Sequence, residues 1–180
     1  MKQLFTYLAV VGFIVAGNKV LAQNESMAKE KDKMEKKMGG ALPYKAVYSA
    51  DFKIGNSSYS KMVLDVWKDW DDNQLDRHSY FADTIVGMFA DGSVSKGKEA
   101  FIADGKKYRN TQASVKSTIH AYVPLISTDR NENVVCIWGT EERTMADGKK
   151  ETGDLHEVWW FNKDGKITML RQWAAKFKKM

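Results

Sequence analysis

The last third of the chain alternates polar and apolar residues in three consecutive segments. These are Val134–Met145, Gly153–Phe161 and Ile167–Lys176, and they are separated by Asp147-Gly148 and Asp164-Gly165. Asp-Gly between alternating segments is a strong signal for a tight hairpin turn. The pattern therefore predicts an antiparallel meander. Its large aromatic surface favours a curved sheet around a pocket, and the residues that supply it are Trp138, Trp159, Trp160 and Trp173.

Upstream of the meander, apolar residues recur at the three- and four-residue spacing of a helix. The clearest case is a helix that starts near Ser57, with Ser57 or Ser58 as its cap, and its apolar face comprises Tyr59, Met62, Val63, Val66, Trp67 and Trp70. The remaining expected elements are a short helix over Gln74–Tyr80, a strand over Thr84–Phe89, a helix over Gly97–Asn110 and a strand over Ser114–Val123 that ends at Pro124.

The order of these elements predicts an α+β fold. It reads helix, short helix, strand, helix and then four strands, so we expect three helices to cover one face of a strongly bent antiparallel sheet. The sequence shows one folded domain, residues 57–176, followed by a basic tail, residues 177–180.

The amino terminus has the pattern of a secretory signal. Lys2 precedes the apolar run Leu4–Val15, and Val20-Leu21-Ala22 offers small or medium residues for cleavage before Gln23. The run is short for a bilayer span. We therefore expect residues 1–22 to be a cleaved signal peptide, without a stable membrane anchor, and the protein to be exported to the periplasm or the medium. Residues 23–56 are expected to form a charged linker and an amino-terminal arm.

Charge and cysteine content narrow the function further. The net charge of +5 falls to about +3 without the signal, and the lysines of residues 29–37 alternate with acids, so nucleic-acid binding is not expected. Cys136 is the only cysteine, which excludes an internal disulfide, and it fits a small buried hydrophobe. Without a His-x-His or Cys-x-x-Cys spacing, neither a metal nor another cofactor is expected.

Three short motifs, in this order, resemble the nuclear transport factor 2 (NTF2) superfamily, and within it SnoaL-like and ketosteroid-isomerase-like proteins. They are Tyr80-Phe81-Ala82-Asp83, Gly97-Lys98-Glu99-Ala100 and the segment from Trp160 to Ile167. The resemblance implies a cone-shaped sheet whose mouth holds a small, mostly apolar molecule. It also implies homodimers through the convex sheet face, where Trp160 or Trp173 would otherwise meet water.

The resemblance does not extend to the catalytic residues of ketosteroid isomerases. Where those enzymes place the proton-abstracting Asp, this chain has the segment Gly87–Phe89, and where they place a helix Tyr it has Val66 or Trp67. Their second acid has a counterpart in Glu157. Ketosteroid isomerase chemistry is therefore not expected.

Glu157 is the main candidate for chemistry in the pocket. In the isomerase-like register Glu157 and Trp159 point into the cone, where burial would raise the pKa of the carboxyl group. The alternative is an ion pair with Arg171 or a lysine across the sheet. His120 and His156 are candidate proton shuttles on strands whose faces the sequence leaves open. The expected pocket lining comprises Trp67, Tyr80, Phe89, Trp138, Trp159 and Gln172.

Two classes of function remain open. The first is an exported module that binds a small hydrophobic molecule or interacts through its outer sheet face. The second is a cofactor-free isomerase, cyclase or dehydratase that uses Glu157 with a histidine as acid and base. An enzyme of this kind needs Glu157 and a histidine side chain in the same cavity.

Overall fold

The computed structural model describes residues 43–175 and 177–179. The expected signal peptide and most of the expected linker therefore lie outside the described residues. Among the described residues, the folded unit begins at Val47. It thus begins ten residues before Ser57, where the sequence places the boundary, because part of the expected arm pairs with the sheet.

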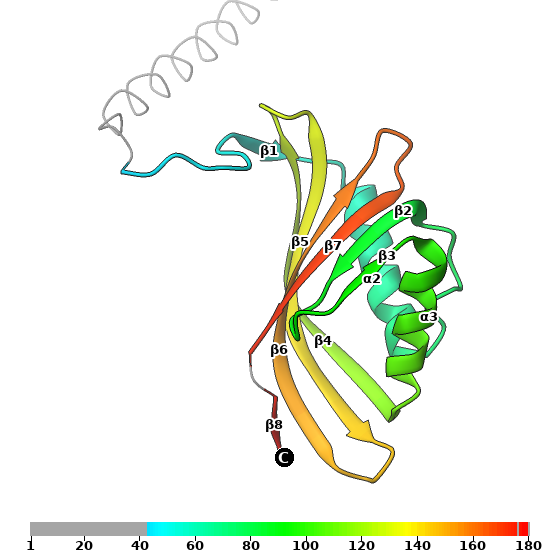
Figure 1. Ribbon diagram of the computed structural model, residues 1–180. Helices are drawn as coiled ribbons and strands as arrows, with labels where there is room; N and C mark the ends of the chain where they lie inside the picture. Colours follow the sequence, from blue (N-terminus) through cyan, green and yellow to red (C-terminus); the bar gives the residue numbers. More distant parts are fainter. Residues whose placement is uncertain (1–42, 176, 180) are drawn as a thin grey trace, which may run out of the picture. The chain divides into compact units, whose positions relative to one another are not determined.

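The core of this unit is a mixed sheet with two helices on one side (Figure 1). The strand order is β1-β4-β5-β6-β7-β2-β3. Strand β8 lies off this path and pairs with the amino-terminal end of β6, whereas β7 pairs with its carboxyl-terminal part. All neighbouring strands are antiparallel except β2 and β7, which are parallel. The prediction of a wholly antiparallel sheet is therefore wrong at this pair. The strands are β1 (Phe52–Ile54), β2 (Phe81–Met88), β3 (Val94–Lys96), β4 (Gln112–Ser127), β5 (Glu132–Met145), β6 (Lys150–Phe161), β7 (Ile167–Ala174) and β8 (Lys178–Lys179).

The meander forms where the alternating pattern predicts it. Strands β5, β6 and β7 pair in sequence order, and both Asp-Gly turns are present between them. Gly148 and Gly165 adopt φ angles of 82° and 74°, in the left-handed region that side chains disfavour. Glycine at these two positions therefore fixes the turns and the register of the strands.

The two helices are α2 (Ser57–Asp71) and α3 (Lys98–Arg109). The cap of α2 is Asn56, whose side chain accepts a 2.9 Å hydrogen bond from the Ser58 backbone N–H, rather than either of the serines expected to cap it. On the buried face of α2, Val63 is fully buried and packs into the core with Ile85 of β2 and Ile137 of β5. This packing holds the helix against the concave face of the sheet.

The third expected helix, over Gln74–Tyr80, is wrong: the segment forms turns. The buried Asp69 carboxylate explains this, because it binds both Arg77 Nη1 at 2.9 Å and His78 Nδ1 at 2.6 Å. Both contacts hold the segment against the last turn of α2, to which Asp69 belongs. Two helices, not three, therefore cover the sheet in the described part of the chain.

Strand β4 continues past Pro124, where the sequence analysis ends it. The Pro124 carbonyl accepts a hydrogen bond from Gly55 N at the β1 side. The N and O atoms of one strand residue point to the same side, so the missing N–H faces β1 and leaves the pairing with β5 intact. A bulge between Ile119 and Ala121 bends the same strand, and Figure 1 shows the long strands curving around the helices.

None of the described helices is long and apolar enough to cross a lipid bilayer.

Candidate functional site

The concave face of the sheet and the two helices border a cavity of about 700 Å³. Its walls come from α2, α3, the β2–β3 hairpin and the meander, and Phe177 near the carboxyl terminus also contributes. The side chain of Phe177 packs on Gly153, where any Cβ atom would lie 2.8 Å from its ring. Of the residues expected to line a pocket, this cavity collects Trp67, Phe89, Glu157, Trp159 and Gln172.

Glu157 lines this cavity and is buried, with 5% of its surface exposed. Its Oε2 atom accepts hydrogen bonds from the indole N–H groups of Trp67, at 2.7 Å, and Trp159, at 3.0 Å. Its Oε1 atom accepts a 2.8 Å hydrogen bond from the Gln172 amide. Helix α2 and strands β6 and β7 therefore all contribute a donor to one carboxyl group.

The alternative of an ion pair with Arg171 is wrong. Arg171 pairs across the sheet with Val158, on the opposite face from Glu157, and its guanidinium lies 5.1 Å from the centre of the Trp173 ring. All three partners of Glu157 are uncharged N–H donors. Alternation along β6 places Trp159 on the same face as Glu157, whereas Gln172 is recognised as a donor only once the β6–β7 register is known, which sets it opposite Glu157.

Burial raises the pKa of Glu157 from 4.5 to about 7. Hydrogen bonds from Gln172, Trp67 and Trp159 favour the ionised form and oppose this rise, whereas the nearby charge of Glu141 adds to it. A carboxyl group with this pKa exists in both protonation states near neutral pH. It can therefore accept a hydrogen bond, donate one, or attract a cation, according to what enters the cavity.

The cavity contains a second buried carboxylate, Glu141, which the sequence analysis did not single out. The indole N–H of Trp70 donates a 2.8 Å hydrogen bond to Glu141 Oε2. Burial raises the pKa of Glu141, and the Trp70 hydrogen bond and the charge of Arg143 lower it. The signal that could have found this site is the helical spacing of Trp67 and Trp70, which places two indole donors on one face of α2.

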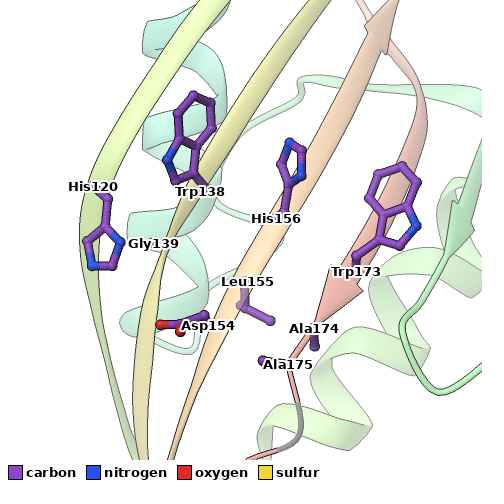
Figure 2. A pocket seen from close by; sticks show the side chains of 9 residues that line it. All are labelled: His120, Trp138, Gly139, Asp154, Leu155, His156, Trp173, Ala174 and Ala175. Carbon is purple, nitrogen blue, oxygen red and sulfur yellow. The ribbon is translucent and has the colours of Figure 1, made fainter.

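His120, Trp138, His156 and Trp173 lie on the opposite, outer face of the sheet. Figure 2 shows their rings side by side on neighbouring strands, away from the helices. They line a shallow hollow of about 650 Å³. The His156 ring centre lies 5.7 Å from the ring centres of both Trp138 and Trp173. His120 Nε2 lies 3.0 Å from Thr140 Oγ1, which also donates a hydrogen bond to Asp154.

This arrangement separates residues that the sequence analysis grouped together. Neither His120 nor His156 reaches the cavity that contains Glu157, and Trp138 faces away from Trp67 and Trp159. The reason is the β5–β6 register, in which Trp138 pairs with His156 while Ile137 pairs with Glu157. The third histidine, His78, binds Asp69 and stacks on Tyr80, outside the cavity.

Tyr80 also lies outside the cavity, contrary to its expected role in the lining. Its hydroxyl donates a 2.9 Å hydrogen bond to Asp65. Asp83, from the same motif, binds Lys98 at the surface at 2.7 Å. The motif therefore supports the surface of α2 and the start of α3 rather than the cavity wall.

Trp160, an expected interface residue, is partly covered by the arm of its own chain. The indole N–H donates a 2.9 Å hydrogen bond to the hydroxyl of Tyr48, whose ring lies edge-on at 6.0 Å. Tyr48 in turn donates to Glu132 at 2.6 Å. Trp138 and Trp173 remain the large exposed aromatics of the outer face, with 40% and 44% of their surface exposed.

Cys136 is half-buried on β5, and burial raises the pKa of its thiol. A raised pKa makes the thiolate scarce, which fits a packing role rather than a nucleophile. Within residues 43–175 and 177–179, no cluster of histidine, cysteine, aspartate and glutamate side chains is arranged to hold a metal ion.

Comparison with known proteins gives the fold. No protein-family model matches the chain, and no curated protein matches it in sequence. Solved structures do match in three dimensions. One is an NTF2-like protein of unknown function from Burkholderia pseudomallei, which is 16% identical, with a TM-score of 0.54 over 65% of this chain and 90% of that one.

Two enzymes are also among the similar structures. The epoxide hydrolase/cyclase-like enzyme SalBIII, of pyran ring formation in salinomycin, is 11% identical, with a TM-score of 0.55 over 69% of this chain and 97% of that one. The Δ5-3-ketosteroid isomerase from a Mycobacterium species is 18% identical, with a TM-score of 0.51 over 67% of this chain and 98% of that one. The chain therefore has the NTF2-like fold, whose members include isomerases and cyclases.

Proposed function

We propose that this protein is an exported binding protein that holds a small, largely apolar molecule in the cavity between the sheet and the helices, with Glu157 as its polar anchor. The observation that carries this proposal is the combination of a cavity of about 700 Å³ and the buried carboxyl group of Glu157, held in its wall by three N–H donors. Small-molecule sites are typically apolar clefts of this size with a few fixed polar groups.

Two features argue against ketosteroid isomerase chemistry. The resemblance puts the proton-abstracting acid in the segment Gly87–Phe89, and at Gly87 an added Cβ atom would lie 2.7 Å from the Phe101 ring. A carboxylate side chain therefore has no room there. The helix position that carries a Tyr in those enzymes corresponds to Val66 or Trp67. Neither side chain has an acidic hydroxyl, although the Trp67 N–H donates to Glu157.

The enzymatic alternative needs Glu157 and a histidine in one cavity. His120 and His156 line the outer hollow, and His78 binds Asp69, so none of them can exchange a proton directly with a molecule beside Glu157. Binding is therefore the better-supported function.

Export and self-association complete the proposal. The apolar run Leu4–Val15 and the cleavage pattern before Gln23 support secretion. The exposed rings of Trp138 and Trp173 on a sheet face support dimerisation of two copies through that face.

Native mass spectrometry of the exported protein, purified without added ligand, tests the binding function. We expect a bound small molecule that is released on denaturation. Val94 is half-exposed and lines the cavity, so Val94→Trp should obstruct the cavity and reduce occupancy. Val47→Trp, at a fully exposed position, is the matched control and should retain the ligand. Equal occupancy in all three proteins, or none in any, would count against the cavity as the binding site.

A further inference from the structure

The cavity has more buried negative than positive charge. Glu157 and Glu141 both line it, with 5% and 4% of their surfaces exposed. Their close donors, Trp67, Trp159, Gln172 and Trp70, are all uncharged. These N–H groups satisfy carboxylate oxygens but bring no net positive charge.

The guanidinium of Arg143 is shared between Glu141 and a second carboxylate. Arg143 Nη1 lies 3.8 Å from Glu141, beyond hydrogen-bond distance. The same guanidinium binds Glu151 at 3.0 Å, and it stacks 3.6 Å from the centre of the Phe177 ring. Arg143 therefore divides its charge between Glu151 and the longer contact with Glu141, and Glu157 has no cationic partner among the described lining residues.

Aromatic rings dominate the rest of the cavity wall. A cation near the face of a tryptophan, tyrosine or phenylalanine is attracted by the ring quadrupole, most strongly where water is excluded. Buried carboxylates with aromatic walls are thus suited to a ligand that is both apolar and positively charged. The rings that line the cavity are Trp67, Trp70, Phe89, Phe101, Tyr108, Trp159 and Phe177.

We propose, on the basis of the binding function above, that the ligand is an organic cation, an ammonium group on an apolar body, with the nitrogen held by Glu157. Within the described part of the chain, Glu157 Oε1 accepts one hydrogen bond, from Gln172, so it retains a lone pair for an N–H donor. The apolar body packs against the aromatic walls.

Binding of a cation is coupled to the protonation of Glu157. With a pKa of about 7, Glu157 is largely protonated near pH 6 and largely ionised near pH 8. A cation binds the ionised form, so binding releases a proton and strengthens as the pH rises. The other titratable or charged groups that line this cavity are Glu141 and Arg143 of β5, Asp104, Lys107 and Tyr108 of α3, and Asp91 of the β2–β3 turn.

Benzylamine and benzyl alcohol form a matched pair of probes, because they share an apolar ring and differ in charge. Calorimetric titration of the mature protein should show that benzylamine, protonated throughout this range, binds more tightly than the alcohol. Its affinity should rise about tenfold from pH 6 to pH 8. At pH 7, the heat measured in buffers of different ionisation enthalpy should show proton release.

Variants assign this effect to Glu157. Glu157→Gln should weaken benzylamine binding about tenfold or more and remove its pH dependence. Glu142→Gln removes one negative charge at the exposed neighbour of Glu141. It should leave the affinity for benzylamine and its pH dependence unchanged.

Other outcomes would overturn the inference. If benzyl alcohol binds as tightly as benzylamine, or if binding takes up a proton, Glu157 acts as a neutral acid toward an uncharged ligand, and only the binding function survives. If neither probe binds, the cationic ligand is also rejected, and the native mass spectrum shows separately whether the cavity holds another molecule.

Discussion

The indole N–H of Trp67 donates a 2.7 Å hydrogen bond to Oε2 of Glu157, and so joins helix α2 to the concave face of the sheet. Both side chains are buried. The contact links residues that are 90 positions apart in the sequence. Because of this contact, both the stability of the fold and the chemistry of the cavity depend on whether the Glu157 carboxyl group is protonated.

Stability should therefore depend on pH through Glu157. The folded protein holds this proton up to about pH 7, whereas the unfolded chain releases it near 4.5. The contribution to stability is thus fully present below about pH 4.5 and is lost as the pH rises through about 7. The loss is about 3 kcal/mol, from the size of the pKa shift.

Urea unfolding of wild type and Glu157→Gln between about pH 4.5 and about pH 8 measures this loss. The Gln variant cannot ionise, so it should lack the part of the pH dependence that comes from Glu157. Its stability relative to wild type should therefore increase with pH, and near pH 8 the variant should be the more stable protein. Parallel curves for the two proteins would show that Glu157 keeps an ordinary pKa.

Trp67→Phe should destabilise the protein more at alkaline than at acidic pH. The change keeps an aromatic ring but removes the donor, and a hydrogen bond to an ionised carboxylate is stronger than one to a neutral acid. We expect an additional loss of about 1–3 kcal/mol in the free energy of unfolding at about pH 8 relative to about pH 5. Trp138→Phe, on the exposed outer face, is the control and should show no such difference. The same loss at both pH values would mean that packing alone accounts for Trp67.

The outer sheet face should mediate dimerisation. Trp138 and Trp173 are large, exposed and aligned with His156 between them (Figure 2). We expect wild type to sediment as a dimer at micromolar concentration and Trp138→Glu to sediment as a monomer, because the new charge would be buried without a partner. Val94→Glu, at the cavity mouth, should remain dimeric. A monomeric wild type would contradict the proposal.

Export should yield a protein that begins at Gln23. Cleavage after Ala22 removes the apolar run that follows Lys2. Amino-terminal sequencing of protein from the periplasm or medium should therefore read Gln-Asn-Glu-Ser. Recovery of the chain in a membrane fraction with Met1 retained would contradict cleavage.

The sequence predicted those parts of the fold that depend on local signals. The meander follows from alternation and two Asp-Gly turns, and α2 and α3 follow from apolar spacing. The segment Gln74–Tyr80 was wrongly predicted as a helix, because its shape depends on the binding of Arg77 and His78 to Asp69. Propensity and spacing contain no information on that contact.

The site was predicted only in part, because some of its residues are placed by local alternation and others by tertiary packing. Alternation along β6 alone places Glu157 and Trp159 on one face and His156 on the other. Assigning Trp138 required the β5–β6 register, and the bulge beside Ile119 interrupts the alternation on which any assignment of His120 depends. Register and bulges are set by the packing of the whole sheet.

A crystal structure of the mature protein as isolated tests the central claim most directly. We predict electron density for a small molecule in the cavity, packed against Trp67 and Trp159, with a polar atom within hydrogen-bond distance of Glu157 Oε1. A cavity that holds only ordered water beside Glu157, or that has closed with Trp67 and Trp159 filling its space, would contradict a binding function for this site.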